Sequence, residues 1–286
     1  MKFNIVILDP PEFKWTHFCF DSAKTVYYGI LSAGYPCSIS RAAFEPGCIN
    51  IIFGADLIQK PFEVQEVVSF GDYVVYQNEA IVNDQINGVR GNDHFDKVYL
   101  PLLQNARAVW EGIPHLMDYW KTVDVRAQFL LWGYHPALEE IKYKRERDID
   151  FLFFGSITEH RLALLNKLKE RGHSICSVFD HKAIYRNDLI ARAKVHLSMR
   201  QHDVLNHLAW CKHCYLINNR GLVVSERCRD QEWLEPCFIT ADTDQWVDAC
   251  VDALNRPDRQ EIADGFYEQY KKVTMADRIG PLLAEL

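Results

Sequence analysis

The stretch Ile149-Asp-Phe-Leu-Phe-Phe-Gly-Ser156 decides how the fold of this chain is interpreted. Residues 149–154 form a short, nearly continuous apolar run, which is typical of a strand buried on both faces of a parallel sheet. Gly155 and Ser156 then form a turn. Residues 158–171 follow with apolar side chains at helical spacing, and Gly172 ends that pattern. The stretch therefore predicts a strand, a tight turn and a helix.

The same alternation of strands and helices extends in both directions along the chain. After residue 172 we expect strands at 175–178, 195–198, 222–225 and 237–239, and helices at 183–193, 203–218, 243–255, 257–272 and 275–285. Before residue 149 we expect strands at 3–8, 37–40, 49–53, 73–76, 106–110 and 127–131, and helices at 18–33 and 113–120. Segment 80–100 has no clear period and is interpreted as a long loop or as short helices.

Two such series, joined by a charged segment near 136–148, predict an α/β fold with two Rossmann-like domains. We place these domains at 1–140 and 141–286, and we expect that the last helix returns to pack on the first domain. In parallel sheets of this kind, ligands bind beyond the carboxyl ends of the strands. The default site is therefore a cleft between two facing domains.

Composition narrows the class of protein. The 286 residues are 48% hydrophobic and 25% charged, which is ordinary for a globular protein. The net charge of −7 argues against a general binder of nucleic acid or membrane surfaces, because such proteins need clustered positive charge. The densest basic patch is Lys-Tyr-Lys-Arg-Glu-Arg at 142–147. We interpret it as a solvated linker, although the net charge leaves room for a local pocket that binds one small anion.

The chain shows no signal peptide, and no apolar run approaches the roughly 20 residues of a membrane helix. Nine cysteines at irregular spacings fit free thiols in a reducing compartment. We therefore expect a cytoplasmic protein with no integral membrane segment.

Several segments, taken in order, resemble a bacterial family of GT-B glycosyltransferases, the spore-maturation-protein-like glycosyltransferases. Each segment alone is weak, and the order and spacing carry the resemblance over about 50–226. The segments are Asn50-Ile-Ile-Phe-Gly-Ala55, Tyr76-Gln-Asn-Glu79, Val109-Trp-Glu111, Leu131-Trp-Gly-Tyr-His-Pro136, the stretch 149–156, Arg161, Ile190-Ala-Arg-Ala-Lys-Val195 and Tyr215-Leu-Ile-Asn-Asn-Arg-Gly-Leu-Val-Val-Ser-Glu226.

The resemblance implies the GT-B architecture and transfer of a sugar from a nucleotide-diphosphate donor to an acceptor bound by the N-terminal domain. The acceptor would be a glycan, a lipid-linked sugar or a small molecule, and no cofactor or metal is expected. The chain departs from the family where an acidic residue followed three positions later by Arg is expected, since Ala209 and Lys212 stand there. This departure leaves open a non-catalytic nucleotide-binding protein of the same fold. A sugar-nucleotide epimerase is a further alternative.

The turn after the first strand of the second domain suits a diphosphate. Gly155 lets the backbone approach a phosphate closely, and a helix that begins near Thr158 presents free N–H groups. Ser156 belongs to the same turn, and Arg161, one turn inside the helix, would add a positive charge. The alternative is an ordinary strand-to-helix turn with Thr158 as the cap and Arg161 solvated.

Other candidate donor-binding residues follow later strands. The resemblance places Glu226 where a carboxylate accepts hydrogen bonds from a ribose diol, and Ser225 lies beside it. Without the resemblance, Glu226 would be a carboxylate at a helix N-terminus. Arg200 and His202, just past a strand, are candidates for the sugar or the diphosphate. Lys212 is a further phosphate candidate, although an ideal helix over 203–218 points it elsewhere.

That helix would also carry Asp203, His207, Cys211 and Cys214 on one face. Such a stripe invites a zinc interpretation. However, structural zinc sites draw ligands from two elements, and their cysteine pairs lie on turns. We therefore expect no metal, with the cysteines packed as small apolar groups and with Asp203 and His207 near the cleft.

For the acceptor, an inverting enzyme needs a general base from the N-terminal domain. Asp9, at the end of the first strand, and Glu79, after Tyr76, are the candidates, with His17 behind them. Structural or capping roles are the alternative for each. A retaining enzyme would need no such base.

Overall fold

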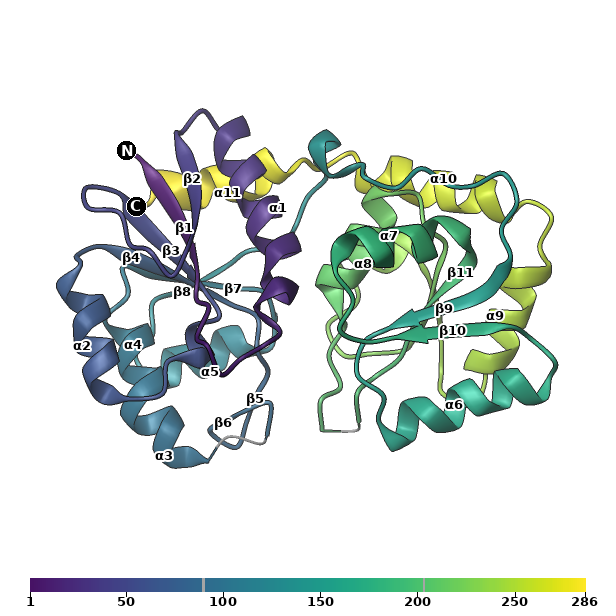
Figure 1. The fold of residues 1–286 in the computed structure, drawn as a ribbon, viewed down its shortest axis with the longest axis horizontal. Coiled ribbons are helices and arrows are strands. Elements are labelled where there is room, and N and C mark those ends of the chain that lie inside the picture. The colour runs from purple at the N-terminus through teal and green to yellow at the C-terminus, as the bar shows by residue number, and fades with distance from the viewer. Residues whose placement is uncertain (89–90, 203) are drawn as a thin grey trace. The chain divides into compact units, whose positions relative to one another are not determined.

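A computed structural model describes residues 1–88, 91–202 and 204–286. Its contacts divide the chain into two compact units, shown in Figure 1. Unit 1 comprises Met1–Gly133 and Thr274–Leu286, and unit 2 comprises Tyr134–Val273. The division thus lies a few residues before 140, and the last helix belongs to unit 1.

The sheet of unit 1 has six strands, all parallel, in the order β2-β1-β3-β4-β7-β8. The central strands β1, β3 and β4 are buried along their whole length, as their apolar runs predict. A two-stranded hairpin, β5-β6, stands apart from this sheet. The strands are β1 (Phe3–Ile7), β2 (Cys37–Arg41), β3 (Ile49–Phe53), β4 (Tyr73–Gln77), β5 (Ile81–Val82), β6 (Gln85–Ile86), β7 (Ala108–Glu111) and β8 (Ala127–Phe129).

The longer helices of unit 1 connect these strands, and the C-terminal helix packs against the first one. A Thr274 cap begins that C-terminal helix, because its hydroxyl accepts a hydrogen bond from the Asp277 N–H. The helices are α1 (Cys19–Ser32), α2 (Pro61–Ser69), α3 (Asn92–His94), α4 (Leu100–Gln104), α5 (Leu116–Thr122) and α11 (Met275–Ala284), with short 3₁₀ or π turns η1 (Thr16–Phe18), η2 (Ala55–Leu57) and η3 (Phe95–Tyr99).

The sheet of unit 2 has five parallel strands in the order β10-β9-β11-β12-β13. The strand order therefore reverses between β9 and β11. In doubly wound sheets such a switch point opens a crevice at the carboxyl ends of the strands. The strands are β9 (Ile149–Phe154), β10 (Ile175–Val178), β11 (Ala193–Ser198), β12 (Val223–Glu226) and β13 (Ile239–Ala241).

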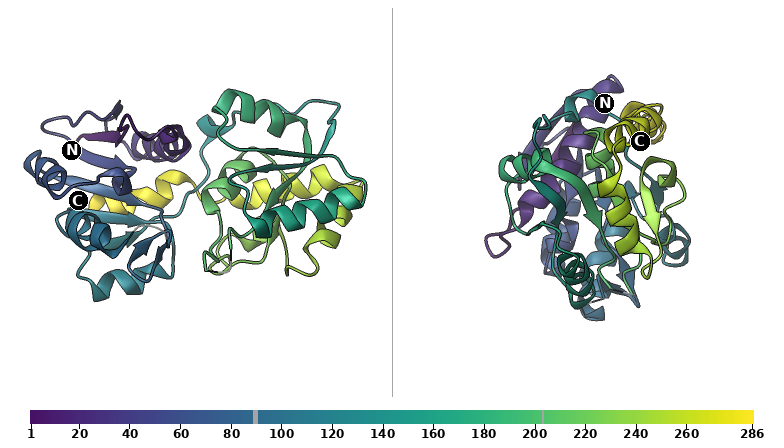
Figure 2. Two further views of the ribbon diagram at one scale, coloured as in Figure 1. Left: turned by 60° about the horizontal axis from the view of Figure 1, so that its bottom comes forward. Right: turned by 90° about the vertical axis from the view of Figure 1, so that its right-hand side faces the viewer.

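Helices cover both faces of the unit 2 sheet (Figures 1 and 2). On one face, α6 and α9 pack against the strands around a core that includes Phe151, Leu164, Val224 and Trp246. On the other face, α7 and α8 cover β9, β11 and β12. The helices are η4 (Pro136–Leu138), α6 (Glu159–Glu170), α7 (Ala183–Arg192), α8 (Trp210–Asn218), η5 (Glu235–Cys237), α9 (Trp246–Asn255) and α10 (Arg259–Tyr270).

The predicted α/β fold, with two Rossmann-like units built on parallel sheets, is confirmed. One helix prediction was wrong, and one helix was missed. The predicted helix over 203–218 begins only at Trp210, because Ala209 has a non-helical backbone and His207 instead forms an isolated bridge with Arg229. Helix α2 was not predicted, although Pro61 stands at its first position, which is a common helix start.

The nine cysteines are free thiols. Within the described ranges, no helix combines the length and the apolar character that crossing a bilayer requires.

Candidate functional site

The turn between β9 and α6 lies at the switch point of unit 2. Gly155 has a φ of +143°, a conformation that side chains with a Cβ rarely adopt. Thr158 caps α6 by accepting a hydrogen bond from the Arg161 N–H at 3.3 Å. The Thr158 hydroxyl also donates to the Gln201 carbonyl at 2.7 Å. The turn is therefore tied to the loop that follows β11, the neighbouring strand across the switch point.

Lys212 lies against this turn. Its ammonium is 4.6 Å from the centre of the Phe153 ring and 5.0 Å from that of Phe154. A Cβ on Gly155 would lie 3.7 Å from the same ammonium. Burial, with a contribution from the charge of Arg161, lowers the pKa of Lys212 to about 7. Because α8 begins at Trp210, Lys212 sits in its first turn and reaches the turn at Gly155, which the ideal helix over 203–218 did not predict.

Arg161 is buried, and its guanidinium is engaged by backbone carbonyls. It donates to the Met199 carbonyl at 2.9 and 3.2 Å, to the Arg200 carbonyl at 3.1 Å and to the Ser156 carbonyl at 2.9 Å. It also contacts the Ser156 hydroxyl at 3.2 Å. Burial lowers the pKa of Arg161 to about 10. The hydrogen bonds of Arg161 therefore link the β9–α6 turn, which includes Ser156, to the residues that follow β11.

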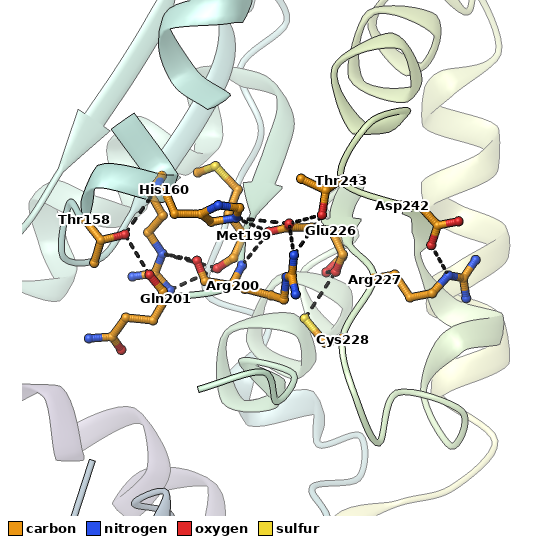
Figure 3. Close-up of polar contacts among 12 residues, drawn as sticks. Thr158, His160, Met199, Arg200, Gln201, Glu226, Arg227, Cys228, Asp242 and Thr243 are labelled. Carbon is orange, nitrogen blue, oxygen red and sulfur yellow. Dashed lines mark hydrogen bonds and ion pairs between the residues drawn. The ribbon is translucent and has the colours of Figure 1, made fainter. Parts of the chain in front are cut away.

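Glu226, the last residue of β12, is the centre of a polar network (Figure 3). Its side chain is fully buried and accepts hydrogen bonds from the Arg200 backbone N–H and guanidinium, both at 2.9 Å. The Thr243 hydroxyl donates to it at 2.6 Å. His160 Nε2 lies 2.9 and 3.0 Å from its two oxygens and donates to them, since an ionised carboxylate only accepts.

These donors decide the charge of Glu226. Burial alone would raise its pKa, but the hydrogen bonds from Arg200, Thr243 and His160 outweigh burial and hold the pKa below its usual value. The side chains of Arg200 and His160 keep 16% and 25% of their surface exposed, whereas Glu226 keeps none. A ligand at this edge would therefore meet Arg200 and His160 before it meets the carboxylate.

Sequence reasoning named Arg200 and Glu226 but missed His160 and Thr243. Both follow a strand of unit 2, His160 in the first turn of α6 and Thr243 just after β13. The carboxyl ends of parallel strands meet at one edge of the sheet. The polar residues that follow each predicted strand could therefore have indicated His160 and Thr243 as site residues.

The other predicted donor-site residues lie apart from this network. Ser225 is fully buried within β12, and its hydroxyl donates to the Glu226 carbonyl at 3.0 Å. His202 is half-buried in the loop after β11, where its Nδ1 accepts from the Leu205 N–H at 3.4 Å.

In unit 1 the candidate bases lie at or near the carboxyl ends of strands. Asp9 follows β1 and accepts from the Thr16 hydroxyl at 2.5 Å and from Arg41 at 3.1 Å. His17 lies beside Thr16 in the turn η1. Glu79, two residues after β4, accepts from the Asn87 side chain at 2.5 Å.

The predicted stripe of metal-type side chains is not one helix face. Asp203 lies outside the described residues, and His207 precedes α8. Among the residues that the structure describes, no cluster of three or more His, Cys, Asp or Glu side chains is arranged to hold a metal.

A comparison with protein-family models found no match, and a comparison with curated proteins found none either. Solved structures do match. AviGT4, a glycosyltransferase involved in avilamycin A biosynthesis, is 11% identical with a TM-score of 0.57, over 100% of this chain and 96% of that one. A UDP-forming α,α-trehalose-phosphate synthase from Burkholderia vietnamiensis is 10% identical with a TM-score of 0.57, over 97% and 78%. TarM is 9% identical with a TM-score of 0.55, over 83% and 54%. At such low identity these matches show the fold, which is of the GT-B type.

Proposed function

We propose that this protein is a glycosyltransferase that moves a sugar from a nucleotide-diphosphate donor, bound by unit 2, to a glycan, lipid-linked or small-molecule acceptor. The resemblance to spore-maturation-protein-like glycosyltransferases and the similarity to solved glycosyltransferase structures support this proposal. The observation that carries it is local. A phosphate-compatible turn, an ammonium and a guanidinium lie at the switch point of one parallel sheet.

The proposed chemistry is the stabilisation of a departing nucleoside diphosphate. As the glycosidic bond breaks, negative charge grows on the diphosphate, and fixed cations lower the energy of that state. Lys212 and Arg200 would supply this charge in place of a metal, with the N-terminus of α6 beside them. The pKa of Lys212, about 7 in the free protein, would rise when the dianion binds.

The structure refines the role that we propose for Glu226. Because its carboxylate is buried and already accepts from Arg200, Thr243 and His160, we assign it first to positioning these side chains. A ribose diol would reach it only if the Arg200 guanidinium or the His160 ring moved aside.

The test begins with thermal unfolding in the presence of uridine, guanosine, adenosine, cytidine and thymidine diphosphates. One of them should raise the Tm by about 5–10 °C at a hundredfold excess over its Kd. Lys212→Gln should remove most of this rise, whereas Lys167→Gln, an exposed control on α6, should not. If none of the five nucleotides raises the Tm, the proposal fails.

Transfer itself is measured as acceptor-dependent release of nucleoside diphosphate from a nucleotide sugar. Lys212→Gln should lower kcat/KM by roughly 10²-fold. Nucleotide binding without release, across a panel of sugars and acceptors, would instead indicate a non-catalytic nucleotide-binding protein.

For the acceptor side we propose Asp9, Glu79 or His17 as the general base of an inverting reaction. Asp9→Asn, Glu79→Gln and His17→Asn are to be compared in turn. Loss of the true base should lower kcat by roughly 10²–10⁴-fold while the Tm changes little. If all three variants keep full kcat, no base among them is used.

A further inference from the structure

Unit 2 contains a second cluster of cations, at the opposite edge of its sheet. A cavity of about 580 Å³ lies there. Arg147 comes just before β9, Lys194 is the second residue of β11, and Arg220 precedes β12, so these side chains mark the amino ends of parallel strands. The lining residues are Tyr143, Lys144, Arg145, Arg147, Lys194, Arg220, Pro257, Arg259, Gln260 and Asp264. We call this the basic cavity.

The basic cavity concentrates positive charge in a chain whose net charge is −7. Three of its cations are neutralised by ion pairs: Lys144 with Asp188 at 2.6 Å, Lys194 with Asp150 at 2.7 Å and Arg220 with Asp264 at 3.3 Å. By contrast, within the described part of the chain no carboxylate pairs with Arg145, Arg147 or Arg259.

Arg147 is held in place by neutral groups. Its guanidinium lies 4.1 Å from the centre of the Tyr143 ring and donates to the Gln260 side chain at 2.5 Å. Burial lowers the pKa of Arg147, and the positive charge of Arg259 lowers it further, whereas the neighbouring Tyr143 and the carboxylate of Asp264 raise it. The only carboxylate among the described lining residues, that of Asp264, is already paired with Arg220, so a bound anion would relieve the repulsion between Arg147 and Arg259.

Other features of the basic cavity are also suited to an anion. Helix α10 begins at Arg259, and no side-chain hydrogen bond caps its N-terminus, although the acidic Glu261 lies in its first turn. Gly221 leaves room for the Tyr143 side chain. A Cβ at position 221 would lie only 3.0 Å from the Tyr143 hydroxyl. As Figure 1 shows, the chain that enters β9 passes beside the start of α10, consistent with the bond from Arg147 to Gln260.

We propose that the basic cavity binds clustered phosphate groups, as carried by a small, multiply phosphorylated molecule. Its volume lies within the range of small-molecule sites, roughly 300–1,000 Å³. Arginine forks match phosphate oxygens in pairs. This site is separate from the donor site, and it does not rest on the proposed glycosyl transfer. The segment 142–147, which sequence analysis interpreted as a solvated linker, thereby becomes part of a binding site.

The first test uses wild-type protein, inorganic pyrophosphate and hydrogen exchange followed by mass spectrometry. Pyrophosphate should slow exchange in peptides that cover 142–148 and 257–264, independently of any change near Gly155. Vesicles of phosphatidylglycerol in phosphatidylcholine form a second arm. Protection by vesicles alone would support phosphate binding with a lipid head group as its source. If neither probe protects these peptides, the proposal is overturned, and binding of an RNA oligomer alone would also overturn it.

The second test changes the cavity. Arg147→Gln with Arg259→Gln should weaken pyrophosphate protection of these peptides at least tenfold. The response of the donor site to a nucleoside diphosphate should remain. Lys169→Gln with Arg171→Gln removes the same charge from exposed positions on α6 and its C-cap and should leave both responses unchanged.

Arg147 is partly buried, so its variant also tests packing. Arg145→Gln, at an exposed position, therefore serves as a second variant and should weaken protection about threefold. Equal weakening by the control pair would show a non-specific charge effect and overturn the proposal.

Discussion

Five strands of the unit 1 sheet have the same order as the five strands of the unit 2 sheet, but the two sheets differ at their carboxyl edges. In unit 1, β4 ends at Gln77, a buried amide that accepts from the Tyr99 hydroxyl at 2.5 Å and donates to the Glu79 carbonyl at 2.6 Å. In unit 2, the corresponding strand β12 ends at Glu226, a buried carboxylate that accepts from a guanidinium, an imidazole and a hydroxyl. Unit 1 also has a buried carboxyl at this edge, that of Glu111 beside Gln77, but burial raises its pKa to about 8, whereas hydrogen bonds hold the pKa of Glu226 below its usual value. Topology supplies the edge, and the residues placed there decide its chemistry.

The largest effect that we expect comes from removing the carboxylate. Glu226→Ala leaves Arg200 and His160 without their shared acceptor and should lower the free energy of unfolding by roughly 3–5 kcal/mol. Gln77→Ala, the matched change in unit 1, breaks neutral hydrogen bonds and should cost about 1–3 kcal/mol. Urea denaturation measures both. Equal losses would show that charge is not what separates the two edges.

A smaller loss is expected for the arginine that fastens the turn. Arg161→Met leaves the carbonyls of Ser156, Met199 and Arg200 without their donor and should cost about 2–3 kcal/mol. Arg171→Met is the control, because that side chain makes an exposed ion pair with Asp248 and should change stability by less than about 1 kcal/mol. A small effect of Arg161→Met would mean that the turn keeps its geometry unaided.

Lys212→Met should stabilise the free protein, with a clear dependence on pH. The folded-state pKa of Lys212, about 7, lies below the usual 10.5, so the unfolded chain binds more protons between these values. The free energy of unfolding of the wild type therefore rises with pH between about 7 and 10.5. Lys212 destabilises the folded protein most below pH 7.

Lys212→Met should thus raise the free energy of unfolding by roughly 1–2 kcal/mol at pH 6, and this increase should become smaller towards pH 10. Denaturation at pH 6, 8 and 10 measures this trend. A gain that is equal at every pH would instead indicate a packing effect.

The smallest effect on stability is expected in unit 1. Asp9 pairs with Arg41 at 3.1 Å, and these side chains are 32% and 61% exposed. Exposed pairs contribute about 0–1 kcal/mol, so Asp9→Asn should lower the free energy of unfolding by less than about 1 kcal/mol. A loss as large as that of Glu226→Ala would mean that unit 1 also holds a charged centre.

Much of the fold could be predicted because its signals are local. The apolar runs at β1, β3 and β9 are short and continuous, and such runs are typical of strands buried on both faces. Helix α6 was predicted from its apolar spacing and from Gly172, which follows it closely. The prediction of where α8 begins was wrong, because the bridge between His207 and Arg229 joins residues that are distant in sequence.

The candidate site was predictable in part for the same reason. Arg200 and Glu226 follow strands, and this position could be inferred from the apolar runs before them. Their mutual contact, and the part of His160 and Thr243 in it, could not be inferred, since these residues are 17 to 66 positions from Glu226 in the chain.

The sequence by itself determined that the stretch 149–156 is a strand and a tight turn, and that a parallel α/β sheet follows. Periodicity and a glycine suffice for this, because they act over a few neighbouring residues. Only the tertiary structure decided that Lys212 lies against Gly155, that Arg161 fastens the turn and that Glu226 is buried beneath Arg200. It also decided that segment 142–147 lines a basic cavity. Such contacts join elements through the strand order of the sheet, which no local pattern encodes.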